Sequence, residues 1–199
     1  MNINMNIKVN IIVAYCENNG IGYKNMLPWR ISSDLNKFKF LTQGNNNNCI
    51  IMGKNTWLSL PKKPLLYRDN LILSSSLNID CITTTTKADY KHNTISKSFN
   101  NIKELELFIK QKNYDEIWII GGDEIYKSFL NNTLNSSFIV SKLYVTHIKK
   151  EFLCDTFFPI IDNNKYKLAD KVISNIDYYD NKINDFITLE LEDLIYELI

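Results

Sequence analysis

Five short, almost continuously apolar runs, separated by segments with helical periodicity, place the strongest constraint on the fold of this chain. The runs are residues 9–15, 49–52, 71–73, 117–120 and 143–148. Their length and their β-branched residues are typical of strands that are buried on both faces. Strands that alternate with helices predict an α/β architecture, in which helices cover both faces of a mostly parallel sheet.

Helices are expected at residues 32–42, 101–112 and 123–130. The first places Leu35 and Phe38 on one side, and Asn36, Lys37 and Lys39 form its polar side. The second opens with an asparagine and, three residues later, a glutamate, which is the spacing of a capping box.

The remaining segments are expected to be loops and a closing hairpin. Residues 45–48 and the polar segment from Thr83 to about Asn101 are typical of surface loops. Residues 165–173 and 182–191 are expected to pair as antiparallel strands.

Length and composition favour one globular domain. The 199 residues are 45% hydrophobic and carry 23 Lys and Arg against 22 Asp and Glu. A net charge of +1 predicts neither a nucleic-acid nor an anionic-membrane partner. The four cysteines form no CxxC pair, so free thiols and no metal site are expected. With no signal peptide or membrane span recognisable, a cytoplasmic location is predicted.

Asp34 is the first candidate functional residue. It stands in the first turn of the expected helix at 32–42, beside the apolar side that runs through Leu35 and Phe38. One interpretation is an aspartate that interacts with the helix dipole. The other is a buried carboxylate that binds a cationic or amidine-like ligand.

Two junctions from strand to helix contain glycine. One is Gly121-Gly122, followed by Asp123 and Glu124, and the other is Gly53-Lys54. Glycine allows close backbone approach, and the N–H groups at a helix start favour phosphate. Neither junction has the GxGxxG or P-loop pattern. Two such starts in one sheet suit an extended dinucleotide.

Arg68 is one of only two arginines, in a chain that otherwise uses lysine. Its planar guanidinium suits a ligand carboxylate, although a surface arginine without a ligand is the simpler interpretation. Trp29 and Tyr126 are more often core aromatics than site residues. His147 alternates with Val145 along a strand and is expected to be structural.

In their order along the chain these segments resemble the dihydrofolate reductase family, over about residues 7–191. The motifs that carry the resemblance are IGYKNMLPW at 21–29 with Asp34 after it, IMGKNTW at 51–57, RDNLILSS at 68–75, IGG through Tyr126 at 120–126, LYVTHI at 143–148 and DTFFP at 155–159. Six motifs in sequence are more specific than any one of them.

The resemblance implies a single-domain dihydrofolate-reductase-like fold over residues 1–191. It has a central, mostly parallel, eight-stranded sheet with an antiparallel C-terminal strand and helices on both faces. Residues 192–199 are then a short C-terminal extension. This extension is either one amphipathic helical turn or the start of a junction to a fused thymidylate synthase.

The resemblance also implies the activity: NADPH-dependent reduction of 7,8-dihydrofolate to tetrahydrofolate, in support of thymidylate and one-carbon metabolism. Asp34 would bind the pterin and favour protonation of its imine nitrogen, N5, with Thr146 and Trp29 supporting it. Antifolates such as methotrexate would bind the same pocket. The implied substrate-binding residues are Val13, Ala14, Leu27, Asp34, Leu35, Phe38, Leu60, Leu65, Arg68, Ile120, Tyr126 and Thr146.

For NADPH the resemblance implies a cradle at the two glycine junctions, with a cis peptide between Gly121 and Gly122. Lys54 with Ser75 would form the 2′-phosphate pocket, and Glu124 stands where some relatives carry a basic group. The implied cofactor-binding residues are Ala14, Ile21, Gly22, Gly53, Lys54, Asn55, Thr56, Ser74, Ser75, Gly121, Gly122, Asp123, Glu124, Ile125 and Tyr126.

Two other functions are weighed against this one. The pyrimidine reductase of riboflavin synthesis shares the fold and NADPH, but it lacks the LPW motif with its acid and a pocket for a carboxylate tail. A non-catalytic nucleotide-binding module is the alternative from another class, although no chemically needed position is replaced. Tight binding of methotrexate distinguishes a working pterin pocket from such a module.

Overall fold

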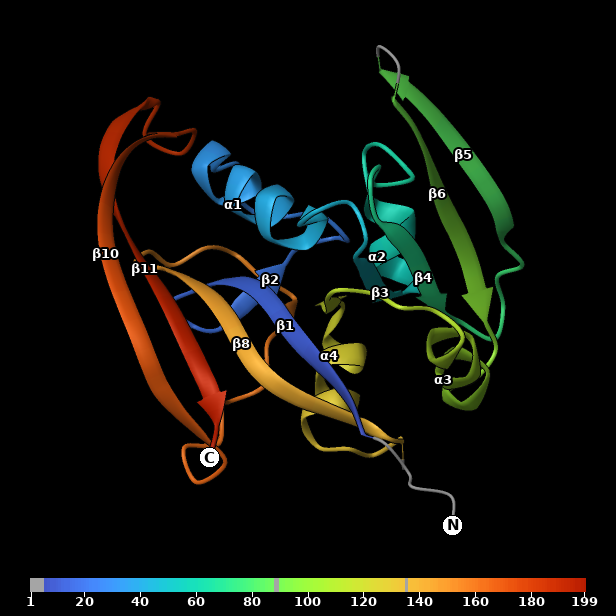
Figure 1. Cartoon of the computed structure of the whole chain (residues 1–199). Helices are drawn as coiled ribbons and strands as arrows, with labels where there is room; N and C mark the ends of the chain where they lie inside the picture. The colour runs from blue at the N-terminus through green and yellow to red at the C-terminus, as the bar shows by residue number, and fades with distance from the viewer. Residues whose placement is uncertain (1–5, 88–89, 135) are drawn as a thin grey trace.

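The computed structural model describes residues 6–87, 90–134 and 136–199, and in these residues one large twisted sheet has nine strands (Figure 1). Its order is β10-β11-β8-β1-β7-β3-β4-β6-β5. The strands are β1 (Ile7–Cys16), β3 (Cys49–Gly53), β4 (Asp69–Leu73), β5 (Asp80–Lys87), β6 (Tyr90–Phe99), β7 (Ile117–Gly121), β8 (Phe138–Ile148), β10 (Tyr166–Asp180) and β11 (Asp185–Leu198).

Five adjacent pairs, from β8 to β6, are parallel, and the three pairs toward the two edges are antiparallel. The mostly parallel α/β sheet and its antiparallel C-terminal strand are therefore confirmed. Figure 1 shows β10 and β11 curving along one end of the sheet, with β5 and β6 at the other end.

The sheet has nine strands rather than the eight that the resemblance implied, and two of the nine, β5 and β6, form a hairpin in the polar segment expected to be a loop. The expected loop from Thr83 to Asn101 was wrong. Threonine is β-branched and suits a strand as well as valine does. Thr94, which pairs with β5, and Ser96, which pairs with both β4 and β5, are buried, so polar side chains occupy places that aliphatic residues usually fill.

In the described part of the chain four helices cover the sheet: α1 (Ser32–Gln43), α2 (Lys54–Ser59), α3 (Ile102–Lys110) and α4 (Asp123–Leu130). Side chains along β1 alternate between the two faces of the sheet. Ile11 and Val13 pack in the cluster that contains residues of α3 and α4, whereas Ile12 packs in the cluster that contains Trp57 of α2 and the apolar side of α1. Helices therefore cover both faces, as expected. The site described below lies on the α1 face.

The closing hairpin is longer than the sequence indicated. Residues 192–198 continue β11 and do not form a helical turn. In this stretch β11 pairs with β8, and Asp193 lies directly opposite Thr146. The backbone groups of β8 need partners along this edge, and a helical tail leaves them without any.

A short two-stranded sheet holds the segment that precedes α1. It pairs β2 (Gly20–Gly22) with β9 (Thr156–Phe157). The backbones of Tyr23 and Met26 then hydrogen-bond each other across a turn, with Lys24 and Asn25 at φ 49° and 59°. The Lys24 N–H donates to the Asp155 carboxylate at 2.8 Å, so this loop is anchored on both sides.

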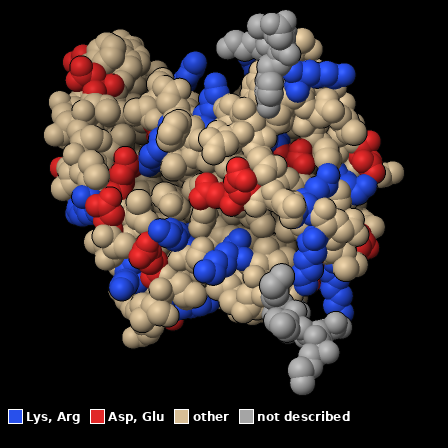
Figure 2. Space-filling view, viewed as in Figure 1, with Lys and Arg blue, Asp and Glu red and all other residues tan. Residues whose placement is uncertain are grey.

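Charges of both signs are interspersed over the face of the molecule drawn in Figure 2. No helix in the described part of the chain is both long and apolar enough to cross a bilayer.

Candidate active site

Asp34 and Thr146 form the centre of the site. Asp34 lies in the first turn of α1, and Thr146 lies on β8 with 2% of its surface exposed. The Thr146 hydroxyl donates a hydrogen bond to Asp34 Oδ1 at 2.6 Å. Only 13% of the Asp34 side chain is exposed. Of the two interpretations of Asp34, the structure favours a buried carboxylate with a specific partner.

Burial is the main influence on the pKa of Asp34 and raises it above the ordinary value. The hydrogen bond from Thr146 and the positive charge of Lys37 lower this pKa, and the negative charge of Asp193 raises it. The carboxyl group is thus poised between opposing effects, which is typical of groups that take part in proton chemistry.

Lys37 lies on the Asp34 side of α1 and not on the polar side assigned to it from the sequence. Its ammonium group is 3.9 Å from Asp34 Oδ1 and contacts both Thr146 Oγ1 and Asp193 Oδ1. Residues three apart on a helix are neighbours, so the i,i+3 spacing to Asp34 is the signal that was overlooked. Asp193 was also missed, because only the register of β11 against β8 brings it here.

Trp29 is 5% exposed and stacks at a tilt on Phe152, with ring centroids 5.2 Å apart. Its indole N–H has no hydrogen-bond acceptor among the described residues, although it is buried. Leu27, two residues earlier, is more than half exposed, so the loop changes from solvent to core within three residues. Buried indole N–H groups usually have a partner, so this one marks a place for a polar ligand atom.

Apolar side chains line the same face beside Asp34. Phe38, Leu60 and Leu65 are half-buried and pack against one cluster of core residues, as does Ile120. Leu35, on α1, is 43% exposed. Three of the apolar substrate contacts that the resemblance implied, Phe38, Leu60 and Leu65, therefore lie together, and we call them the apolar sleeve.

Two neighbouring residues of β1, both expected to contact the substrate, have side chains on opposite faces of the sheet. Ala14 is half-buried and packs with the cluster that contains Trp29, on the α1 face. The Val13 side chain is buried on the opposite face, among residues of α3 and α4. Alternation along the strand leaves only the backbone of Val13 available on the Asp34 side.

Arg68 is 4% exposed, and no carboxylate among the described residues pairs with it. Its guanidinium donates to the carbonyl oxygen of Leu66 at 3.1 Å and to the hydroxyl of Thr42. Burial lowers its pKa to about 10. A buried cation held by neutral acceptors retains its charge for an anionic ligand.

Asn70 fixes the turn that presents Arg68 and Leu65, and sequence reasoning missed it. Fully buried, it accepts from the Leu65 N–H and donates to the carbonyls of Leu65 and Arg68, all within 2.9 Å. A buried asparagine that closes on its own loop in this way orders the backbone before any ligand arrives.

The two glycine junctions lie side by side, because Met52 and Gly121 are neighbours in the β3–β7 pair. The Gly121–Gly122 peptide is cis, as the resemblance implied. A Cβ on Gly122 lies 3.4 Å from Thr56 Oγ1, and a Cβ on Gly53 lies 3.0 Å from the Ile125 side chain. Because Gly53 and Gly122 have no side chain, no Cβ atom enters the space between the starts of α2 and α4 from these two positions.

Tyr126 joins this region to the centre of the site. It is buried under Gly121, and its hydroxyl donates to the Ile12 carbonyl at 2.8 Å. Burial raises its pKa, and the Asp34 charge raises it further. Ile21 is half-buried against the same core cluster and Gly22 is half-buried in β2, at the loop before α1.

Lys54, at the start of α2, donates to the Ser76 hydroxyl at 2.9 Å. The sequence singled out Ser75, whereas the contact is to its neighbour. Ser74 Oγ is 3.5 Å from Ser76 Oγ, so three polar groups gather at this corner. Asn55 is exposed and Thr56 half-buried beside them.

On α4, Asp123 forms an ion pair with Lys127 at 3.2 Å, and Glu124 is exposed. The half-buried Ile125 lies against Gly53. Both acidic residues thus have access to solvent or to a lysine.

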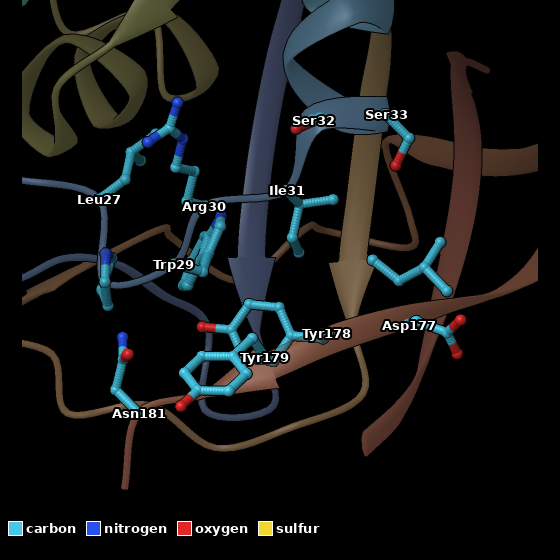
Figure 3. A pocket seen from close by; sticks show the side chains of 12 residues that line it. Leu27, Trp29, Arg30, Ile31, Ser32, Ser33, Asp177, Tyr178, Tyr179 and Asn181 are labelled. Carbon is cyan, nitrogen blue, oxygen red and sulfur yellow. The ribbon is translucent and has the colours of Figure 1, made fainter. Parts of the chain in front are cut away.

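A cavity of about 630 Å³ lies between the loop before α1 and strand β10. Figure 3 shows Trp29 and Arg30 from the loop with Tyr178 and Tyr179 from β10. Trp29 borders this cavity whereas Asp34 does not, and no residue of β10 was predicted to line a site.

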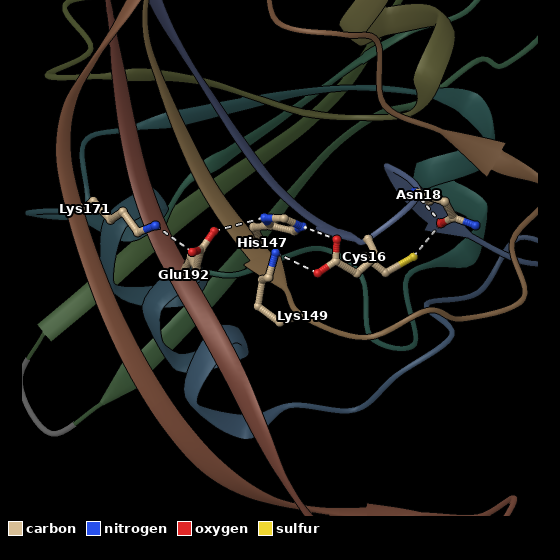
Figure 4. A network of polar contacts seen from close by, with 8 residues as sticks. Cys16, Asn18, His147, Lys149, Lys171 and Glu192 are labelled. Carbon is tan, nitrogen blue, oxygen red and sulfur yellow. Dashed lines mark hydrogen bonds and ion pairs between the residues drawn. The ribbon is translucent and has the colours of Figure 1, made fainter.

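His147 has the structural role expected of it. Its Nδ1 lies 3.1 Å from Glu192, its Nε2 lies 3.5 Å from Glu17, and its ring packs on Tyr15 (Figure 4). Lys171 contacts Glu192 at 2.6 Å in the same network. These contacts tie β11 to β8 on the face opposite Thr146.

A protein-family model described as dihydrofolate reductase matches residues 8–191. A viral dihydrofolate reductase of Saimiriine herpesvirus 2 is 40% identical over 170 residues, which cover 82% of this chain and 74% of the viral protein. The dihydrofolate reductase of Heliothis virescens is 32% identical over 87% of this chain and 95% of its own length. That of Gallus gallus is 35% identical over 80% and 82%. These matches lend no support to a junction with thymidylate synthase.

Proposed function

This chain belongs to the dihydrofolate reductase family, and we propose that its reduction of 7,8-dihydrofolate to tetrahydrofolate uses NADPH and depends on the carboxylate of Asp34. The observation that carries the proposal is the buried Asp34–Thr146 pair, with its 2.6 Å hydrogen bond. It lies on the same face as the apolar sleeve of Phe38, Leu60 and Leu65. A flat, hydrogen-bonding ring with an apolar extension suits this combination.

Asp34 would bind the pterin through the 2-amino group and the adjacent ring N–H. A carboxylate that receives one hydrogen bond from Thr146 retains acceptor positions for both of these donors. Its negative charge raises the proton affinity of N5, the imine nitrogen of the substrate, which is otherwise weakly basic. A larger protonated fraction lowers the barrier to reduction at C6.

Trp29 and Thr146 would support this step without exchanging protons themselves. Thr146 orients the carboxylate, and the buried Trp29 N–H offers a donor to a water molecule that delivers the proton. The backbone of Val13, the half-buried Ala14 and the residues around Ile120 would help to close the pterin pocket.

Arg68 would bind the carboxylate of the substrate's glutamate tail. Its charge has no acidic partner in the described part of the chain, and its guanidinium group donates to the Leu66 carbonyl and the Thr42 hydroxyl. A bidentate contact with a carboxylate completes its hydrogen bonding. Leu27, Leu35 and Tyr126 complete the proposed substrate contacts.

The residues at the glycine junctions fit a dinucleotide. The space between Gly53, Gly122 and Thr56 is one that a Cβ narrows, and the starts of α2 and α4 both face it. Phosphates are favoured at such positions. When bound, NADPH supplies the hydride that reduces C6.

On the cofactor side, Ala14, Ile21, Gly22 and Tyr126 would flank the nicotinamide, and Gly121 with residues 123–125 the pyrophosphate. Lys54 with Ser74, Ser75 and Ser76 would hold the 2′-phosphate, near Asn55 and Thr56. The Lys54–Ser76 contact shows that a cation and a hydroxyl already meet there. A 2′-phosphate pocket favours NADPH over NADH.

We also place the enzyme in the cytoplasm. All four cysteines are free, and the thiols of Cys16 and Cys154 lie 3.8 Å apart in a hydrogen bond and not in a disulfide. Free thiols are typical of a reducing compartment such as the cytoplasm, which is why we propose that location.

The test is a turnover assay with dihydrofolate and either NADPH or NADH, followed by titration with methotrexate. We expect turnover with NADPH, weaker turnover with NADH and tight inhibition by methotrexate. Binding of NADPH without turnover supports the non-catalytic module instead. Reduction of a pyrimidine precursor of riboflavin, without reduction of dihydrofolate, supports the pyrimidine reductase.

A further inference from the structure

Asp193 lies outside the segment that matches the family, which ends at residue 191, and yet its side chain reaches the centre of the site. It stands opposite Thr146 in the β11–β8 pair, so both side chains project from the same face. Asp193 Oδ1 is 3.2 Å from the Thr146 hydroxyl and contacts the Lys37 ammonium group.

The hydrogens that Thr146 and Lys37 carry decide which group donates in each of these contacts. The Thr146 hydroxyl has one hydrogen, and two carboxylates lie within reach of it, Asp34 at 2.6 Å and Asp193 at 3.2 Å. Lys37 has three hydrogens and no acceptor. When Lys37 donates to both Asp193 and the Thr146 oxygen, the hydroxyl hydrogen remains for Asp34.

The result is a chain of donations in which Lys37 gives to Asp193 and to Thr146, and Thr146 gives to Asp34. A hydroxyl that accepts from a cation is polarised and becomes a stronger donor. Lys37 therefore acts on Asp34 in two ways, through Thr146 and through its charge at 3.9 Å.

Few other charged groups face Asp34. Tyr126 approaches from α4 and is neutral, since burial raises its pKa. The neighbours of Thr146 and Asp193, which are His147 and Glu192, pair with each other on the opposite face. Among the described residues, Lys37 and Asp193 thus carry the charges that act most closely on Asp34.

We propose that Lys37 and Asp193 are a positioning pair that sets the proton affinity of the Asp34 site, and with it the pH range in which the enzyme reduces dihydrofolate. The inference rests on the role proposed for Asp34. Reduction needs a protonated N5, so the rate falls as pH rises through the apparent pKa that the carboxylate and the imine share.

The sign of each substitution follows from charge. Lys37→Met removes a cation and frees Asp193 to compete for the Thr146 hydrogen, so both the carboxyl group and the imine hold protons more tightly. The falling limb of the pH–rate profile, where the rate of reduction decreases with pH, moves to higher pH by about one unit. Asp193→Asn removes an anion and releases Lys37 toward Asp34, so the limb moves to lower pH.

The experiment measures the single-turnover rate of dihydrofolate reduction by NADPH across pH, which separates reduction from product release. At about one pH unit above the wild-type midpoint, Lys37→Met is expected to retain about half of its maximal rate, where the wild type retains about a tenth. Lys37→Met/Asp193→Asn restores neutrality and moves back toward the wild-type midpoint. Lys37→Arg retains the charge and stays near it.

Lys39→Met is the matched control, because Lys39 is an exposed lysine on the same helix. It is expected to leave the profile unchanged. A structural defect lowers the rate at every pH and shifts no midpoint.

The inference is overturned if Lys37→Met and Asp193→Asn shift the limb in the same direction or not at all, or if Lys37→Arg shifts it as far as Lys37→Met. Asp34→Asn separates this result from the proposed function. If Asp34→Asn is as active as the wild type, the role of Asp34 fails and the positioning pair fails with it. If Asp34→Asn is inactive and Lys37→Met shifts nothing, only the pair fails.

Discussion

The Thr146 hydroxyl and the Asp34 carboxylate are joined by a 2.6 Å hydrogen bond between β8 and the first turn of α1. The bond links a rigid strand to the helix that carries the apolar sleeve. It also opposes the effect of burial on the pKa of Asp34. The orientation of the Asp34 carboxylate therefore depends on the neutral side chain of Thr146, which β8 holds within the sheet.

Thr146→Val is expected to move the falling limb of the pH–rate profile to higher pH. Valine has nearly the shape of threonine but donates no hydrogen bond, so the pKa of Asp34 rises. The measurement is the single-turnover rate across pH. Thr188→Val, at an exposed position on β11, is the control and should give the wild-type curve. An unshifted profile in Thr146→Val contradicts the role given to this bond.

Arg68→Lys is expected to raise KM for dihydrofolate by about tenfold or more, since an ammonium group does not reproduce two parallel hydrogen bonds to a carboxylate. The comparison substrate is a 6-methyl dihydropterin, which has no glutamate. Its KM should stay near the wild-type value. An equal loss with both substrates indicates a general defect in the pocket and contradicts carboxylate binding by Arg68.

Lys54→Met is expected to weaken the preference for NADPH over NADH by about tenfold. The lysine contacts Ser76 at the corner proposed for the 2′-phosphate. KM is measured for both cofactors, because only NADPH carries that phosphate. Lys167→Met, an exposed position on β10, is the control. The pocket is misplaced if Lys54→Met raises both KM values equally.

Tyr166→Phe is expected to make the unfolding free energy fall less steeply as the pH rises in the alkaline range. Burial raises the pKa of Tyr166 to about 12 in the folded protein, against 10.0 for the ordinary group. The unfolded chain therefore releases this proton first, and stability falls as pH rises from about 10 to about 12. Removing the phenol should reduce the slope of the unfolding free energy by about 1.4 kcal/mol per pH unit. Urea unfolding in this pH range measures the slope, and an unchanged slope contradicts the assignment.

The central strands and three helices were predictable because their periodicity survives in the sequence. Runs such as 117–120 are apolar on both faces and leave few alternatives to a buried strand. The β5–β6 hairpin was not predictable in this way, since threonine and serine fill places usually held by aliphatic residues. Its strands are specified by pairing, of β6 with β4 and of β5 with β6, and not by a local apolar pattern.

The site followed the same division. Asp34, Arg68 and the two glycine junctions stand in local motifs and were identified from them. Lys37 was assigned to the wrong side of its helix, because a lysine in an amphipathic pattern usually faces solvent. Here the buried carboxylate of Asp34 and the carboxylate of Asp193 attract it. Asp193 depends on cross-strand register, which the sequence does not encode locally.

The central claim is that Asp34 promotes protonation of the substrate, and Asp34→Asn tests it most directly. Asparagine has the same shape but carries no charge, so turnover of dihydrofolate with NADPH at neutral pH should fall by about a hundredfold or more. NADPH binding, followed by fluorescence, should stay close to the wild-type value. Turnover by Asp34→Asn at the wild-type rate contradicts the account.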